Sequence, residues 1–155
     1  MAIMKQVTRL HINHRAREWC KLPYPGHRYG CPNYDRKEVC PPQAPLIEDF
    51  FNLNKPLLLI AIKFDLANHV RRMRVLHPEW TDRQARCVLY WQSGVNNDLK
   101  IAALQLCNKR PELTYTLLPE AMGVNVLTTA LDAGIPVKIK PIDIVYKIAL
   151  LGEPK

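Results

Sequence analysis

The sequence predicts one small α/β domain over residues 1–155, with α+β as the alternative arrangement. A chain of 155 residues suits a single domain with one core. Apolar residues make up 48% of the chain, which is ordinary for a globular protein and more than a disordered chain contains. Short apolar runs and helical periodicity both occur along the sequence, and together they indicate a few-stranded sheet with helices.

Each element is assigned from its apolar pattern and its boundary residues. Helices are predicted at residues 46–53, 66–77, 81–110 and 124–133. Extended segments are predicted at residues 56–64, 112–118 and 143–150. Gly94 is expected to bend or split the longest helix, and Gly134 to end the last one. Residues 7–12 are weakly patterned and fit a short strand or a turn of helix, and residues 137–140 alternate as one arm of a hairpin would.

Residues 20–45 differ from the rest of the chain in composition. This stretch holds three of the five cysteines, six of the thirteen prolines and two of the six glycines. Proline removes amide donors and is poorly tolerated in helices and central strands, so the segment is predicted to be an irregular loop. A loop of this length needs something to fix it, and a bound metal is one way to do so.

Cys20, Cys31 and Cys40 are the candidate ligands of that metal. No secretion signal is visible and the cysteine count is odd, so reduced thiols are expected rather than a disulfide framework. Thiolates suit zinc or an iron–sulfur centre, but the spacing of ten and then eight intervening residues matches neither a zinc ribbon nor a bacterial ferredoxin. Three structural thiols without any metal remain the third reading.

The residues around these cysteines resemble a known family. Residues 29–42 read Y-G-C-P-N-Y-D-R-K-E-V-C-P-P, which is similar to the signature of a prokaryotic family of predicted metal-binding proteins, a domain of unknown function. Residues 119–126, P-E-A-M-G-V-N-V, resemble a second segment of that family. The resemblance implies an iron–sulfur cluster, of the 4Fe–4S type, on the cysteines at positions 20, 31 and 40. Members often carry a further cysteine group before the second segment, where this chain has only Cys107.

Three thiolates are one fewer than a cubane cluster normally takes. Cys107 is the first candidate for a fourth ligand and Cys87 the second, with His27 and His14 behind them. A partner subunit is another source. In some metal sites that act on a substrate, the fourth coordination position is left vacant.

Basic side chains lie within and beyond the cysteine loop. His27, Arg28, Arg36 and Lys37 sit beside the presumed centre and are candidate contacts for an anion or substrate. A second group is formed by Arg71, Arg72, Arg74, Arg83 and Arg86, for which simple exposure on a helix face is the alternative.

Two function hypotheses follow. The first is an iron–sulfur protein with a redox, electron-transfer or sulfur-handling role, working with a larger enzyme or redox partner. The second is a module with a structural zinc ion that docks tRNA, another nucleic acid or a protein through its basic surface, since the net charge is +8. Nucleotide-binding and hydrolase signatures are missing from the sequence. No apolar run reaches the length of a membrane span, so a cytoplasmic location is expected.

Overall fold

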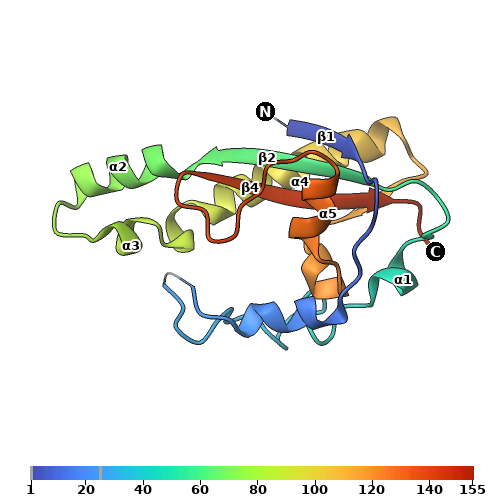
Figure 1. Cartoon of the computed structure of the whole chain (residues 1–155), viewed down its shortest axis with the longest axis horizontal. Helices are drawn as coiled ribbons and strands as arrows, with labels where there is room; N and C mark the ends of the chain where they lie inside the picture. Colours follow the sequence, from blue (N-terminus) through green and yellow to red (C-terminus); the bar gives the residue numbers. More distant parts are fainter. Residues whose placement is uncertain (1, 25) are drawn as a thin grey trace.

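The computed structural model describes residues 2–24 and 26–155; Pro25, within the predicted cysteine loop, lies outside the described residues. Its centre is an antiparallel sheet of four strands in the order β1-β2-β4-β3 (Figure 1). The strands are β1 (Ala2–Gln6), β2 (Leu58–Asp65), β3 (Thr114–Thr116) and β4 (Ile144–Gly152). The two longest strands, β2 and β4, pair along their whole overlap, from Leu58 opposite Leu151 to Asp65 opposite Ile144.

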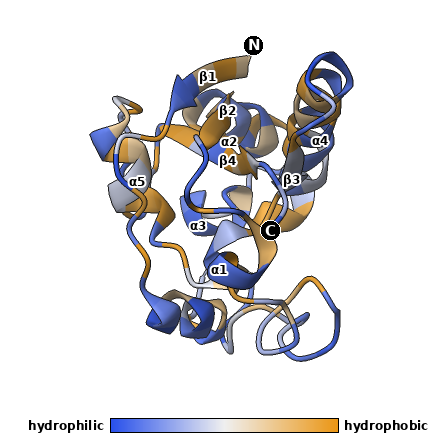
Figure 2. Ribbon diagram, turned by 90° about the vertical axis from the view of Figure 1, so that its right-hand side faces the viewer, coloured by the Kyte–Doolittle hydropathy of each residue, from blue (hydrophilic) through white to orange (hydrophobic). Residues whose placement is uncertain are grey.

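Both faces of the central strands are buried. On one face, Leu59 and Ala61 of β2 pack with the buried residues of α5 (Val126–Asp132). On the other face, Ile60 and Ile62 pack with α4 (Gln92–Lys109). Figure 2 shows the two helices on opposite sides of the sheet. Two-sided burial explains why these strands read as continuous apolar runs and not as alternating ones.

The antiparallel pairing makes the fold α+β, which was the alternative prediction. Most predicted elements are confirmed; the helices are shorter than expected, whereas β4 extends two residues further, to Gly152. The helices also include α1 (Ile47–Phe50), α2 (Leu66–Leu76), α3 (Asp82–Ala85) and three short 3-10 segments, η1 (His14–Lys21), η2 (Val88–Tyr90) and η3 (Pro119–Met122). The residues that the structure describes contain no helix with both the length and the apolar character needed to cross a bilayer.

Two local predictions in the second half of the chain are wrong. The break in the predicted helix over residues 81–110 lies between α3 and α4, and Gly94 is inside α4. Cys87 has extended ψ there, and the indole of Trp91 donates a hydrogen bond to the carbonyl of Arg86, which ends the first helix. Residues 137–140 form no strand, because Val137 packs into the core and Lys138 bonds to Asp143.

The first strand lies earlier than the weak pattern over residues 7–12 suggested. β1 is an edge strand and its side chains are mostly exposed, so it lacks the apolar alternation that marks a half-buried strand. Within residues 7–12, Ile12 instead forms an isolated antiparallel bridge with Val124.

The end of β4 is close-packed. A Cβ at Gly152 would overlap the side chain of Leu57 and lie 3.1 Å from the ring of Phe51, which is fully buried. Gly152→Ala is therefore expected to lower the free energy of unfolding by about 1–3 kcal/mol through overpacking. Gly94→Ala is the matched control, since a Cβ there meets nothing within 4 Å and alanine favours a helix by up to about 1 kcal/mol. Urea unfolding followed by circular dichroism measures both, and equal stability of the two variants would contradict this packing.

Candidate metal centre

The cysteine segment is docked beneath the sheet by its contact with η3 (Figure 1). The amide of Asn13 donates to the carbonyl of Gly123 at 2.7 Å, and the amide of Asn125 donates to the carbonyl of His11 at 2.8 Å. The side chain of Asn13 caps η1, whose penultimate residue is Cys20. The two sequence segments that carry the family resemblance, residues 29–42 and 119–126, both lie beneath the sheet (Figure 1), and Glu38 and Val39 line one cavity together with Met122.

Cys20 and Cys31 are linked through the backbone. The amide of Cys31 donates to the carbonyl of Cys20 at 2.6 Å. This close approach needs Gly30, because a Cβ at that position would overlap the backbone of Cys20 and Lys21, and because its φ of +86° is a left-handed conformation that favours glycine. Cys40, which is buried, follows in a turn closed by its own amide donating to Lys37 at 3.0 Å.

Burial and a neighbouring thiol both raise the pKa of Cys20 and of Cys40. Burial, followed by the charge of Cys31 and then of Glu120, raises the pKa of Cys20 to about 11. The pKa of Cys40 is raised by burial and by Cys31, while Lys37 opposes the shift. Cys31 therefore lies within electrostatic range of the other two loop cysteines.

A fourth thiol, that of Cys87, lies near Tyr24 together with Cys20 and Cys31. The pKa of Tyr24 is raised to about 12 by burial, by the charge of Cys31 and a hydrogen bond with it, and by the charges of Cys20 and Cys87. Cys87 is buried at the start of η2. Its Sγ lies directly against Gly26, where a Cβ would overlap the sulfur. Cys20, Cys31, Cys40 and Cys87 are called the thiol cluster below.

Cys107, the first candidate for the fourth ligand, has a different setting. It lies on α4 and packs against the core cluster of Leu99 and Ala103. Burial alone raises its pKa, with no contribution from another cysteine. From the sequence, Cys87 ranked below Cys107 as a fourth ligand. The contact between Cys87 and Gly26 joins residues about sixty positions apart, and the spacing of cysteines along the chain does not reveal such a contact.

The donor set of the thiol cluster fits a soft metal centre, but it is not a closed ligand set. Within residues 2–24 and 26–155, no three His, Cys, Asp or Glu side chains form a group arranged to hold a metal ion. All four sulfurs are free thiols, and thiolates are the ligands that zinc and iron–sulfur centres take. Metal binding commonly completes the ordering of such a segment, so the thiols would close around the metal as it binds.

The four residues predicted to contact an anion differ in their surroundings. Lys37 lies near enough to lower the pKa of Cys40, and it is exposed, as is Arg36. The guanidinium of Arg28 lies over the ring of Tyr29, with 5.0 Å to the centroid. His27 exchanges two backbone hydrogen bonds with Tyr24, and their rings are 4.9 Å apart. His14, the remaining candidate ligand, binds Glu48 at 2.9 Å.

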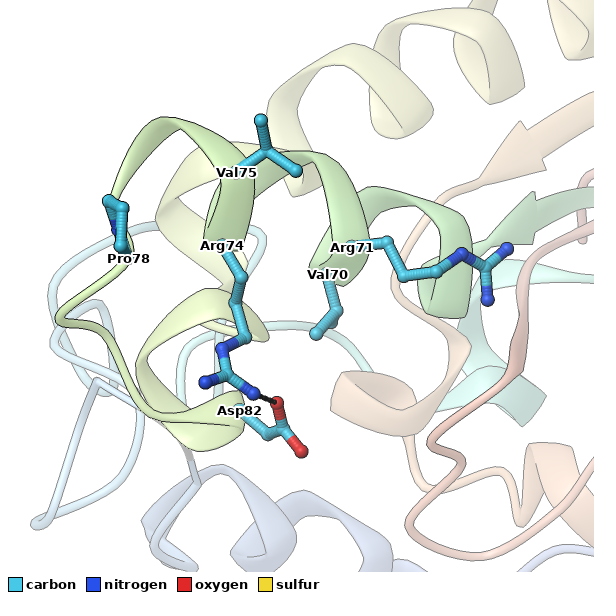
Figure 3. A pocket seen from close by; sticks show the side chains of 6 residues that line it. All are labelled: Val70, Arg71, Arg74, Val75, Pro78 and Asp82. Carbon is cyan, nitrogen blue, oxygen red and sulfur yellow. Dashed lines mark hydrogen bonds and ion pairs between the residues drawn. The ribbon is translucent and has the colours of Figure 1, made fainter.

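The second basic group does not form one continuous face. In a shallow depression between α2 and α3, Arg74 turns toward α3 and its guanidinium bonds to Asp82 at 2.9 Å, while Arg71 extends away from that pair (Figure 3). Arg83 and Arg86 instead line a separate cavity of about 450 Å³ together with Tyr24.

Comparisons of the chain with protein-family models, with curated proteins and with solved structures found no match. The family resemblance of the cysteine segment therefore stays a prediction, and the function rests on the chemistry of the site itself.

Substituting Gly30 tests the close approach of Cys31 to Cys20. Gly30→Ala is expected to break the 2.6 Å hydrogen bond between them, because the new Cβ overlaps backbone that cannot move aside. Hydrogen exchange of the Cys31 amide should then become fast. Gly134→Ala is the control: its φ of +90° carries the same strain, about 1–2 kcal/mol, but a Cβ there meets nothing within 4 Å. A Cys31 amide equally protected in both variants would refute the arrangement.

Proposed function

We propose that the chain is an iron–sulfur protein whose 4Fe–4S cluster is held by Cys20, Cys31, Cys40 and Cys87. The observation that carries this proposal is a series of short-range effects between two segments far apart in the sequence: Cys31 raises the pKa of Cys20 and of Cys40, while Cys20, Cys31 and Cys87 all raise the pKa of Tyr24. Four thiolates are the usual ligand set of a cubane cluster. A zinc ion on the same thiols is the alternative that shares this observation.

Cys87 is favoured over Cys107 as the fourth ligand by its surroundings. Its sulfur faces the backbone of the cysteine loop at Gly26, whereas Cys107 is packed among apolar side chains of the sheet and α4. A thiolate among apolar groups carries a large desolvation cost unless a cation is close to it. Within the thiol cluster, a metal would supply that cation for all four sulfurs at once.

If the four thiolates close around a cluster as it binds, they would favour electron transfer among the predicted redox and sulfur-handling roles. The cluster would supply one-electron chemistry and would leave no coordination position for a substrate. Cys20 and Cys31 are only partly buried, so the centre would lie near the surface. The exposed Arg28, Arg36 and Lys37 around it would attract an acidic surface on a larger redox partner.

Metal and sulfide analysis of anaerobically prepared protein tests the ligand set. Cys20→Ser, Cys31→Ser, Cys40→Ser and Cys87→Ser are each expected to lose most of the iron and sulfide and the broad visible absorbance, because a missing thiolate opens the cluster. Cys107→Ser is the matched control and should keep all three. It is a partly buried cysteine outside the thiol cluster, so the same chemical change is made without touching a proposed ligand.

The opposite pattern of losses would overturn the assignment. Retention of a full cluster by Cys87→Ser with loss in Cys107→Ser would restore Cys107 as the ligand. Retention by both would point to a three-thiolate cluster with an open position. Colourless protein with one zinc ion per chain would replace the iron–sulfur proposal by the zinc alternative.

A nucleic-acid interface is a second candidate function, and one observation favours it. Arg83, Arg86 and Lys140 converge with Tyr24 and Trp91 around the cavity of about 450 Å³ beside the cysteine loop. Cations interleaved with aromatic rings are typical of surfaces that bind single-stranded nucleic acid, where rings stack on bases and cations contact phosphates.

A comparison of two arginine substitutions separates binding at this cavity from nonspecific attraction by the net positive charge. Binding of a short single-stranded RNA should weaken steeply as salt rises, and Arg86→Gln should weaken it further. Arg110→Gln removes the same charge at the far end of α4, where Arg110 already pairs with Glu112 at 2.9 Å, and should leave binding unchanged. Absent binding, or equal effects of the two substitutions in a fluorescence-anisotropy titration, would remove this function.

A further inference from the structure

A second cavity, of about 350 Å³, lies at the unpaired edge of β4. β3 pairs only with residues 150–152 of β4, so residues 144–148 face η3 and α5 without a neighbouring strand on that side. The lining is mainly apolar and includes Trp19, Leu118, Val126 and Ile148. Its volume falls at the lower end of the range, about 300–1,000 Å³, that small-molecule sites occupy.

Two opposite charges interrupt this apolar lining. Lys147 comes from the middle of β4, and Glu120 comes from η3. Both residues line the cavity and are partly exposed. Burial raises the pKa of Glu120 and lowers that of Lys147, and in each case the attraction of the partner opposes the shift without cancelling it.

The two charges do not satisfy each other directly. Among the described residues, neither group takes part in an ion pair within 4.0 Å, and the hydrogen bond that lowers the pKa of Glu120 comes from its own backbone and not from Lys147. Charged groups held in an apolar site without a direct partner are costly for the fold alone. Opposed charges converging on a largely apolar cavity are the arrangement expected of a binding site.

We propose that this cavity binds a small zwitterion with an apolar substituent, of which an apolar α-amino acid is the simplest case. Lys147 donates to its carboxylate, Glu120 accepts from its ammonium group, and the apolar substituent lies against Trp19 and Val126. The exposed Lys140 at the lining strengthens the attraction for the carboxylate end, whereas Lys138 is paired with Asp143 at 3.3 Å.

The cavity adjoins the thiol cluster. Glu120 is close enough for its charge to raise the pKa of Cys20, and Trp19 is the residue before that cysteine. A bound zwitterion would therefore sit beside the proposed metal centre. The side chains that bind the two charged groups of the zwitterion belong to β4 and η3, and Trp19 of η1 adds apolar packing, so no proposed metal ligand takes part in its recognition.

Calorimetric titration of the purified protein with three probes tests the proposal. L-leucine should bind saturably. 4-Methylpentanoate, which lacks the ammonium group, and 3-methylbutylamine, which lacks the carboxylate, should each bind at least about tenfold more weakly, because each loses a charged hydrogen bond. Lys147→Met and Glu120→Gln should each weaken leucine binding to a similar degree.

Lys63→Met is the matched control, since Lys63 is an exposed lysine on the neighbouring strand β2 and should leave leucine binding unchanged. Amide chemical-shift mapping on the wild-type protein does not depend on any variant folding. It should show leucine-induced shifts around Trp19, Glu120, Val126 and Lys147. Absence of saturable leucine binding, equal binding of all three probes, or shifts confined to another part of the surface would overturn the proposal. Metal content plays no part in these readouts, so they fail or succeed separately from the iron–sulfur assignment.

Discussion

Docking of the cysteine segment onto the domain depends on a short stretch of backbone pairing between residues 11–13 and 123–125. The two hydrogen bonds there, Asn13 to Gly123 and Asn125 to His11, join the connection between β1 and β2 to the turn before α5. Gly123 has no Cβ, which would otherwise meet the ring of His14 at 2.6 Å. This junction fixes the position of η1, and with it Cys20 and Trp19, relative to Glu120.

Groups that are costly for folding are concentrated around this junction. The thiol cluster collects ionisable sulfurs whose charges disfavour one another, and the cavity beside it holds Glu120 and Lys147 without a direct ion pair. The sheet and its two helical layers supply the apolar packing that offsets such costs. Proteins tolerate local conflicts of this kind mainly at functional sites, which is why the junction carries both proposals.

Local signals were enough to predict most elements of the fold. The capping box of Thr81 and Gln84 marks the start of α3, and Gly134 follows the end of α5 in a left-handed conformation, as expected. The edge strand β1 was missed because exposed side chains leave no apolar pattern. The helix break near Cys87 was misplaced at Gly94 because neither glycine nor proline marks it; the extended ψ of Cys87 and the hydrogen bond from the Trp91 indole to the Arg86 carbonyl lie there instead.

The candidate site was only partly predictable for the same reason. The proline and glycine context of Cys31 and Cys40 pointed to the loop, but the approach of Cys87 to Gly26 is a long-range contact that a single sequence does not encode visibly. Lys147 had a signal that was overlooked, since a lysine in the middle of the apolar segment IVYKIAL is unusual for a strand in the core of a sheet.

Anomalous scattering from crystals of anaerobically prepared protein tests the central claim most directly. Difference maps collected on either side of the iron absorption edge locate iron without reference to any substituted residue. The account predicts one iron peak enclosed by the sulfurs of Cys20, Cys31, Cys40 and Cys87. An iron peak beside Cys107, a peak that appears only at the zinc edge, or a metal bound with Cys87 still packed against Gly26 and outside bonding distance would contradict it.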